Sequence, residues 1–238
     1  MSKAFQFKQF KIEQDKCAMK IGTDGVLLGA WASIDPQPFS VLDIGAGTGV
    51  IALMLAQRSF AELIDALEIE ENAYEQCVDN FENSDWGDRL FCYHAALDEF
   101  AEEMEGETYD LIISNPPFYD ENFTSTEENR NLARFTEALP FEDLVKYSAQ
   151  LLAEKGKFCT IIPHKNEEEL IQLASKEKLF PQKITRVRGH KNSPIKRSLL
   201  QFGFEQTTLE TSELIIEIDR HVYTEDYKNL VRDFYLKM

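Results

Sequence analysis

The stretch Val41-Leu-Asp-Ile-Gly-Ala-Gly-Thr-Gly-Val50 carries the clearest structural signal in the chain. The apolar run Val41 to Ile44 predicts a buried strand, and the apolar segment Val50 to Arg58 predicts a helix. Three glycines lie in the turn between them, and such glycines let the backbone approach a ligand closely. The stretch therefore predicts a ligand site at a strand-to-helix turn, although a tight turn without a ligand is the structural alternative.

Short β-rich runs alternate with helical patterns on both sides of this turn, which indicates a parallel sheet covered by helices on both faces. After Leu179 the strand-like runs follow one another without a long helix, and we expect them to be antiparallel edge strands. The last apolar residues, Tyr227 to Tyr235, have helical spacing, so the C-terminus should dock on the domain. The predicted strands are Val41 to Ile44, Leu63 to Ile69, Arg89 to Tyr93, Tyr109 to Ser114, Lys157 to Ile162, Lys183 to Arg188, Ser198 to Glu205 and Leu214 to Ile218.

The residues before the first sheet strand have a character of their own. Phe5 to Phe10 predicts a short strand, Lys20 to Gly25 a glycine-flanked turn, and Val26 to Ala32 a helix. Residues 1–38 are thus expected to form an extension over the cofactor, and residues 39–238 a single globular catalytic domain. Thr23 or Asp24 is the expected N-cap of the helix, and contact with a ligand is the alternative role for this turn.

The chemistry around the glycine turn indicates which cofactor it would hold. Gly49 follows Gly47 by two residues, whereas the dinucleotide fingerprint needs three, so the spacing disfavours NAD. Asp43 would repel a pyrophosphate but attract a cationic, amine-bearing ligand. Glu68 ends the next strand, where a ribose-binding acid is expected. These features indicate S-adenosylmethionine.

At this point the chain resembles the class I S-adenosylmethionine-dependent methyltransferases. The resemblance implies a Rossmann-like α/β fold with a seven-stranded, mostly parallel sheet in the order 3-2-1-4-5-7-6. Many relatives have an acidic residue after the third strand, but Ala96 stands at that position here and leaves backbone contacts only. The residues that the resemblance assigns to the cofactor in this domain are Asp43, Gly45, Ala46, Gly47, Gly49, Glu68, Ile69, Ala96 and Asn115.

Asn115-Pro-Pro-Phe118 follows the fourth sheet strand, at the edge where ligands bind in open α/β sheets. The amino group of an adenine has a delocalised lone pair, so its methylation requires acceptors that hold both N–H bonds. Asn115 Oδ1 and the Pro116 carbonyl would be those acceptors, Pro117 would stiffen the loop, and Phe118 would stack on the base. The tetrapeptide resembles the motif of methyltransferases of adenine N6, guanine amines, cytosine N4 or glutamine amides.

The distribution of charge bears on the substrate. The chain has 238 residues and a formal charge of −17, which taken alone disfavours a polynucleotide partner. The segment Lys183 to Arg197, however, contains six Lys or Arg and no Asp or Glu. A local basic patch of this kind indicates phosphate binding, with a solvated loop as the alternative. The predicted RNA-binding residues are Arg186, Arg188, Lys191, Lys196 and Arg197.

Composition also limits the setting of the protein. Four scattered cysteines and four histidines have no metal-ligand spacing, so we expect no metal site. No apolar run is long enough to span a membrane, and the N-terminus lacks a signal-peptide pattern, so we expect a cytoplasmic protein. Nothing in the sequence indicates an obligate protein partner.

The N-terminal turn with Lys20 to Gly25, the segment Leu27 to Trp31, Arg186 to Arg197 and Asp233 to Tyr235 together resemble the bacterial valine-tRNA (adenine-N6)-methyltransferase family. The resemblance implies methylation of the adenine immediately 3′ of the anticodon. It also implies that Lys20, Thr23, Asp24 and Gly25 close over the cofactor, and that Arg188, Lys191 and Arg197 grip the anticodon stem-loop. A methyltransferase of another amine, such as an rRNA guanine or a glutamine side chain, and a non-catalytic RNA- or cofactor-binding module are the alternatives.

Overall fold

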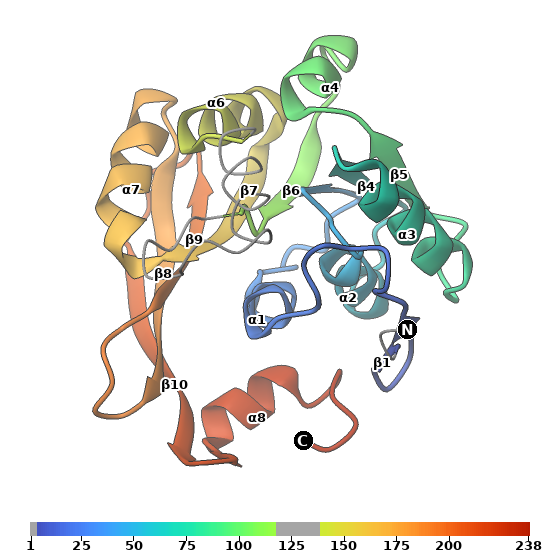
Figure 1. Cartoon of the computed structure of the whole chain (residues 1–238). Coiled ribbons are helices and arrows are strands. Elements are labelled where there is room, and N and C mark those ends of the chain that lie inside the picture. Colours follow the sequence, from blue (N-terminus) through green and yellow to red (C-terminus); the bar gives the residue numbers. More distant parts are fainter. Residues whose placement is uncertain (1–3, 118–138) are drawn as a thin grey trace, which may run out of the picture.

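The computed structural model describes residues 4–117 and 139–238, and within them nine strands form one twisted sheet. The order across the sheet is β11-β10-β8-β9-β7-β6-β3-β4-β5 (Figure 1). The strands are β3 (Ser40–Ile44), β4 (Leu63–Glu68), β5 (Leu90–His94), β6 (Tyr109–Ser114), β7 (Leu152–Pro163), β8 (Phe180–His190), β9 (Arg197–Gly203), β10 (Glu210–Asp219) and β11 (Val222–Tyr223).

Seven of these strands have the order 3-2-1-4-5-7-6, which confirms the expected class of fold. Strands β5, β4, β3, β6 and β7 are mutually parallel, and β9 is antiparallel to both β7 and β8. The sheet is wider than the seven strands that the resemblance implies, because β10, which the sequence predicts as a strand, and β11 extend it beyond β8. The prediction of antiparallel edge strands holds for the pairs β8–β9 and β10–β11 but is wrong for the pair β8–β10. The chain crosses β8 after leaving β9, so β10 runs parallel to β8.

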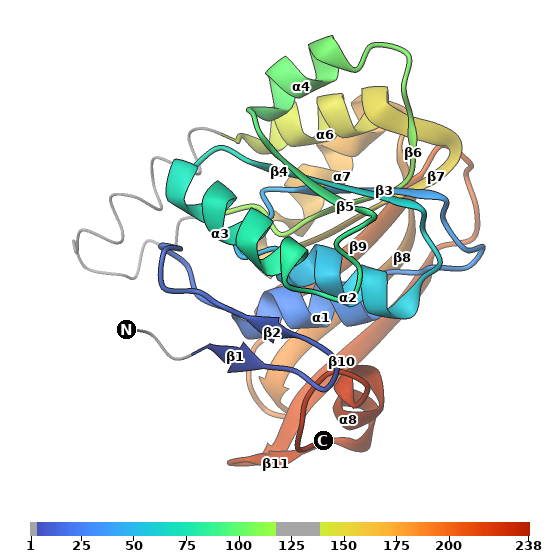
Figure 2. The same ribbon diagram turned by 90° about the vertical axis from the view of Figure 1, so that its right-hand side faces the viewer.

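Helices cover the sheet on both sides, as the alternating pattern predicted (Figures 1 and 2). One apolar core lies on each face, because successive side chains of a strand point to opposite faces. Val41 belongs to the core on the face covered by α1, α2, α3 and α8. Leu42 belongs to the core on the opposite face, which α4, α6 and α7 cover. The helices are α1 (Thr23–Trp31), α2 (Val50–Arg58), α3 (Glu71–Glu82), α4 (Leu97–Glu103), α6 (Phe141–Leu151), α7 (Glu167–Lys176) and α8 (Glu225–Val231).

The N-terminal residues pack on this domain in close contact with the C-terminus. Strands β1 (Phe5–Gln6) and β2 (Lys11–Ile12) form a small hairpin, and Phe7 bridges to Tyr235. Helix α1 packs on α2 and lies in the same core. It begins three residues earlier than expected. The boundary at residue 38 between the extension and the catalytic domain stays a prediction. Helix α1 of the extension shares its apolar core with α2 of the catalytic domain.

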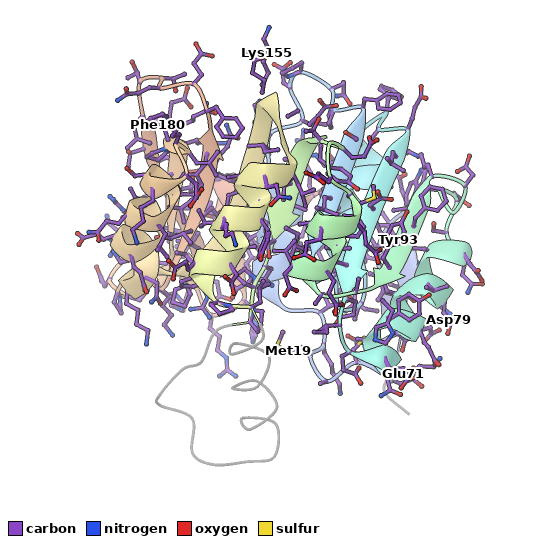
Figure 3. All side chains as sticks on the ribbon, turned by 90° about the horizontal axis from the view of Figure 1, so that it is seen from above. Met19, Glu71, Asp79, Tyr93, Lys155 and Phe180 are labelled. Atoms are coloured by element: carbon purple, nitrogen blue, oxygen red, sulfur yellow. The ribbon has the colours of Figure 1, made fainter. Side chains whose placement is uncertain are left out.

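The carboxyl ends of the parallel strands meet at one edge, and the functional motifs lie there. The chain passes from β3 to β4 and β5 on one side and returns to β6 on the other, so the sheet has its topological switch point beside β3. Pro163, which ends β7, pairs with Arg197, which begins β9. The basic loop 191–196 is therefore at this same edge. Lys155 and Phe180 lie at the opposite end from Met19 and Glu71 (Figure 3).

Among the described residues, no helix is both long enough and apolar enough to cross a membrane.

Candidate active site

A cleft opens where β3, β4, β5 and β6 end. Its wall is mainly apolar, with a few polar groups. The lining residues are Cys17, Ala18, Met19, Ile44, Gly45, Gly47, Leu67, Glu68, Ile69, Glu70, Ala73, Ala95, Ala96, Leu97, Asn115, Pro117 and Leu139. The cleft thus combines residues from the glycine turn, from three strand ends and from the N-terminal extension.

The three glycines of the turn have different surroundings. All have positive φ, at 72° for Gly45, 56° for Gly47 and 77° for Gly49. A Cβ atom on Gly45 or Gly47 would meet nothing within 4 Å, so both leave open space beside the cleft. A Cβ on Gly49 would lie 2.5 Å from the Phe81 ring, because α3 packs directly against this residue. Gly49 therefore serves packing as well as backbone conformation, and it does not line the cleft.

Asp43 lies fully buried beneath the turn. Its Oδ2 accepts a hydrogen bond from Ala52 N in the first turns of α2, at 3.1 Å. Its Oδ1 is buried and has no hydrogen-bond partner among the described residues. Burial raises the pKa of Asp43 to about 7, and the charge of Glu68 acts in the same direction, against the hydrogen bond from Ala52. A cationic ligand would stabilise the ionised carboxylate.

Glu68 combines two roles at the end of β4. Oε2 accepts from Gly47 N at 2.8 Å, which fixes the turn, and Oε1 accepts from Glu70 N at 2.9 Å. Burial raises the pKa of Glu68 in spite of these hydrogen bonds. Each carboxylate oxygen can accept more than one hydrogen bond, so Glu68 also offers acceptors to hydroxyl groups of a ligand in the cleft. Ile69 and Ala96 line the same cleft.

Asn115 lies between the cleft and α1. Its Oδ1 is a second buried acceptor for which the described residues provide no partner. Its Nδ2 would lie 3.9 Å from a Cβ built on Gly25. Pro117 also lines the cleft, Pro116 is buried, and Phe118 lies outside the described residues. Asn115 Oδ1 is thus an acceptor at the place where the sequence predicted one.

The N-terminal wall differs from the sequence prediction. Cys17, Ala18 and Met19 line the cleft, whereas Lys20 and Thr23 are exposed and are not part of its lining. The sequence prediction does not include Cys17, Ala18 and Met19, although they directly precede the turn Lys20 to Gly25. The short apolar run Cys17-Ala-Met19 beside this turn is the one feature of the sequence that could have indicated a place in the cleft wall.

Neither Thr23 nor Asp24 caps the helix, so this prediction is wrong. The N-cap of α1 is Gly22, which has no side chain to form a cap. The Asp24 carboxylate instead accepts a hydrogen bond from Arg197 Nε at 2.7 Å. This ion pair joins the start of α1 to the start of β9.

The basic patch is largely paired within the protein. Arg186 contacts both oxygens of the buried Glu167, with the shortest N–O distance at 2.6 Å. Arg188 pairs with Glu213 at 2.7 Å. Lys191 and Lys196 are exposed. A charge count along the sequence could not reveal the two arginine pairs, because Glu167 and Glu213 lie outside the segment Lys183 to Arg197.

Among residues 4–117 and 139–238, no group of three or more His, Cys, Asp or Glu side chains is arranged to hold a metal ion.

Comparison with known proteins gives consistent results. Residues 31–178 match the family model "Methyltransferase small domain". The chain is 64% identical to a tRNA1(Val) (adenine(37)-N6)-methyltransferase of Christiangramia forsetii, with 98% of each chain covered. It is 61% identical to the protein of that name from Flavobacterium johnsoniae, over 98% of this chain and 100% of the relative.

Solved structures show the same fold at low sequence identity. A predicted O-methyltransferase of Agrobacterium tumefaciens has a TM-score of 0.69 at 18% identity, covering 89% of this chain and 96% of that one. A 16S rRNA N2 G1207 methyltransferase of T. thermophilus, solved with AdoMet and guanosine, has a TM-score of 0.58 at 16% identity, covering 85% and 50%.

Proposed function

The chain belongs to the tRNA1(Val) (adenine(37)-N6)-methyltransferase family, and on that premise we propose that it methylates N6 of the adenine 3′ of the anticodon in a valine tRNA. Its methyl donor is S-adenosylmethionine. The observation that carries the proposal is the buried acceptor Oδ1 of Asn115, which lines a cleft built around the glycine turn. An exocyclic amine, which has two N–H donors, is the chemical complement of such an acceptor.

The residues of the cleft fit S-adenosylmethionine. Asp43 Oδ1 is an orphaned buried acceptor that a cationic amine would satisfy. Gly45 and Gly47 leave open space that a Cβ would occupy. Glu68 offers acceptors for ribose hydroxyls, and the apolar side chains of Ile69 and Leu97 suit a flat purine ring.

The chemical step needs positioning more than proton transfer. When bound, S-adenosylmethionine supplies an electrophilic sulfonium methyl. Asn115 Oδ1 and the Pro116 carbonyl hold the two N6 protons of the adenine, so that the nitrogen lone pair is directed at the methyl. As the new C–N bond formed, the bond from the methyl carbon to sulfur would break and leave a neutral thioether. No strong base is required, because the methylated nitrogen is then cationic and acidic enough to lose one proton to water. The apolar wall with Cys17 and Pro117 excludes water from the donor.

The RNA would contact the edge of the sheet where the cleft opens. An adenine in an anticodon loop is partly unstacked, so extruding it costs only a few kcal/mol. Lys191 and Lys196 are exposed at this edge, while Arg186 and Arg188 are paired with Glu167 and Glu213. We therefore infer that the two lysines contribute most to the grip on the anticodon stem-loop, and that the two arginines mainly shape the loop.

A direct assay tests the proposed function. The protein is incubated with labelled S-adenosylmethionine and tRNA from cells that lack this modification, and the product is digested to nucleosides. We expect the label in N6-methyladenosine of a valine tRNA. Label in a guanine, in protein, or in no product at all would overturn the proposal in favour of another amine substrate or a non-catalytic role.

Substitution of the two lysines tests the RNA surface. The double variant Lys191→Glu and Lys196→Glu should raise KM for tRNA by on the order of tenfold and weaken its salt dependence, because fewer phosphates are neutralised. The Kd for S-adenosylmethionine should stay unchanged. Lys155→Glu with Lys176→Glu is the matched control with the same charge change, because both lysines are exposed. Lys155 lies at the opposite end of the molecule from Met19 (Figure 3), and Lys176 ends α7 shortly before Phe180, which lies at that same end. If both double variants raised KM for tRNA equally, the effect would come from overall charge and not from RNA contact at Lys191 and Lys196.

A further inference from the structure

Helix α3 has two buried amide side chains that the proposed chemistry does not use. Gln76 and Asn80 are only 3% exposed each, and they are four residues apart, so they lie on one face of the helix. Burying an amide is costly unless its hydrogen-bonding groups find partners. Both side chains find partners in backbone groups that are distant in sequence.

Asn80 joins two segments that form the cleft. Its Oδ1 accepts from Glu13 N, and its Nδ2 donates to Glu13 O and to Thr48 O, all at 2.9 Å. Thr48 belongs to the glycine turn, and Glu13 belongs to the N-terminal extension. One side chain thus connects the turn to the extension, through hydrogen bonds that an amide can form and that an apolar side chain of similar size cannot.

The extension passes from Asn80 along α3 towards the cleft, and we call residues 13–19 the strap. Gln76 Oε1 accepts from Lys16 N at 3.1 Å, and Lys16 Nζ lies 3.2 Å from both Glu75 and Asp79. The next three residues of the strap, Cys17 to Met19, form part of the cleft wall. Figure 2 shows the chain after β2 passing beside α3, and Figure 3 shows Met19 and Glu71 at the same end of the molecule.

We propose that Asn80, assisted by Gln76, is a positioning residue that holds the strap against the glycine turn and so keeps Cys17 to Met19 in place as the cover of the cofactor cleft. This inference rests on the proposed function, because it assigns the cleft to S-adenosylmethionine. Neither side chain lines the cleft, so both act on the cofactor only through the strap and the turn.

The substitution Asn80→Leu tests the proposal, since leucine has the same number and branching of side-chain heavy atoms and favours a helix but can form none of the three hydrogen bonds. We expect Kd and KM for S-adenosylmethionine to rise at least about tenfold, with kcat at saturating cofactor within about threefold of the wild-type value. The Kd for tRNA should not change. The strap should also become more accessible, so limited trypsin digestion should cleave faster after Lys16 and Lys20.

Two further variants keep the test decisive if Asn80→Leu folds poorly. Gln76→Leu removes only the hydrogen bond to Lys16 N and should have a smaller effect of the same kind. Asn83→Ala is the control variant, because Asn83 Nδ2 donates to Asp79 O of its own helix and, among residues 4–117 and 139–238, to no group of the strap. All measurements are made well below the melting temperature of each variant, so that a general loss of stability does not enter Kd.

The outcomes separate this inference from the proposed function. If the wild-type protein binds S-adenosylmethionine and Gln76→Leu and Asn80→Leu bind it equally well, the positioning role is wrong and the function stands. Faster cleavage of the strap with unchanged Kd would also overturn the positioning role. If the wild-type protein binds neither S-adenosylmethionine nor its demethylated product in calorimetry, the proposed function itself fails.

Discussion

Replacing Asn115 with alanine is expected to lower kcat by on the order of 10²–10³, the loss usual when one preorganised hydrogen-bonding group of an active site is deleted. Asn115 Oδ1 is buried at the cleft and has no partner among the described residues, so it is available to a substrate amine. Alanine leaves the amine without one of its acceptors, and its lone pair loses alignment with the methyl donor. Single-turnover kinetics with saturating tRNA measure the effect directly.

The cofactor should bind to Asn115→Ala with a Kd within about threefold of the wild-type value, because Asp43, Glu68 and the glycine turn remain intact. Asn115→Asp is the informative companion, since its carboxylate retains an acceptor oxygen of nearly the same shape. It should lose less activity than the alanine variant. A kcat for Asn115→Ala within a few-fold of wild type would show that Asn115 is not the amine acceptor.

The sequence predicted best those elements whose two ends have strong local signals. Strand β6 and helix α2 agree with the predicted bounds to the residue, Tyr109–Ser114 and Val50–Arg58. The two prolines after Asn115 end β6, and the glycine turn begins α2. The Asn115-Pro-Pro-Phe118 motif and the carboxylates Asp43 and Glu68 could be located for the same reason, because the motif directly follows a predicted strand and each carboxylate is the next-to-last residue of one.

The sequence could not predict which distant groups meet. The pairing of Arg186 with Glu167 joins β8 to α7, and that of Arg197 with Asp24 joins β9 to α1. Both follow from sheet topology, which the periodicity of single segments does not encode. The direction of β10 relative to β8 could not be predicted either, since the residue pattern of an edge strand fits a parallel and an antiparallel neighbour equally well. In the sequence, Asn80 is a polar residue next to the apolar Phe81 with no signal of its own, and its three backbone partners are seen only in the structure.

Replacing Asp43 with asparagine is expected to stabilise the ligand-free protein above pH 7 and to weaken cofactor binding strongly. The pKa of Asp43 is about 7 in the folded protein, against 3.8 for an unperturbed group. The folded state therefore binds more protons than the unfolded state between these values, so the stability of the wild type falls as pH rises from about 4 to about 7. The cost above pH 7 is on the order of 4 kcal/mol.

Asparagine removes this cost because it has no charge to desolvate, and its Oδ1 can still accept from Ala52 N. We expect Tm of Asp43→Asn at pH 8 to exceed that of the wild type by several degrees, and the difference to vanish near pH 4. Glu68, whose pKa is also raised by burial, titrates in both proteins, so the difference between them reports Asp43 together with its charge coupling to Glu68. Calorimetric scans of the ligand-free proteins across this pH range check the prediction.

The same substitution should raise Kd for S-adenosylmethionine about 10- to 100-fold, because a charge-assisted hydrogen bond contributes about 1.5–3 kcal/mol. Wild-type affinity should fall up to tenfold for each pH unit below about 7, since the cationic ligand requires Asp43 to be ionised. Asp43→Asn should bind weakly with a much flatter pH profile. A variant that is stabilised at pH 8 and also binds as tightly as wild type would show that the buried carboxylate of Asp43 does not serve the cofactor.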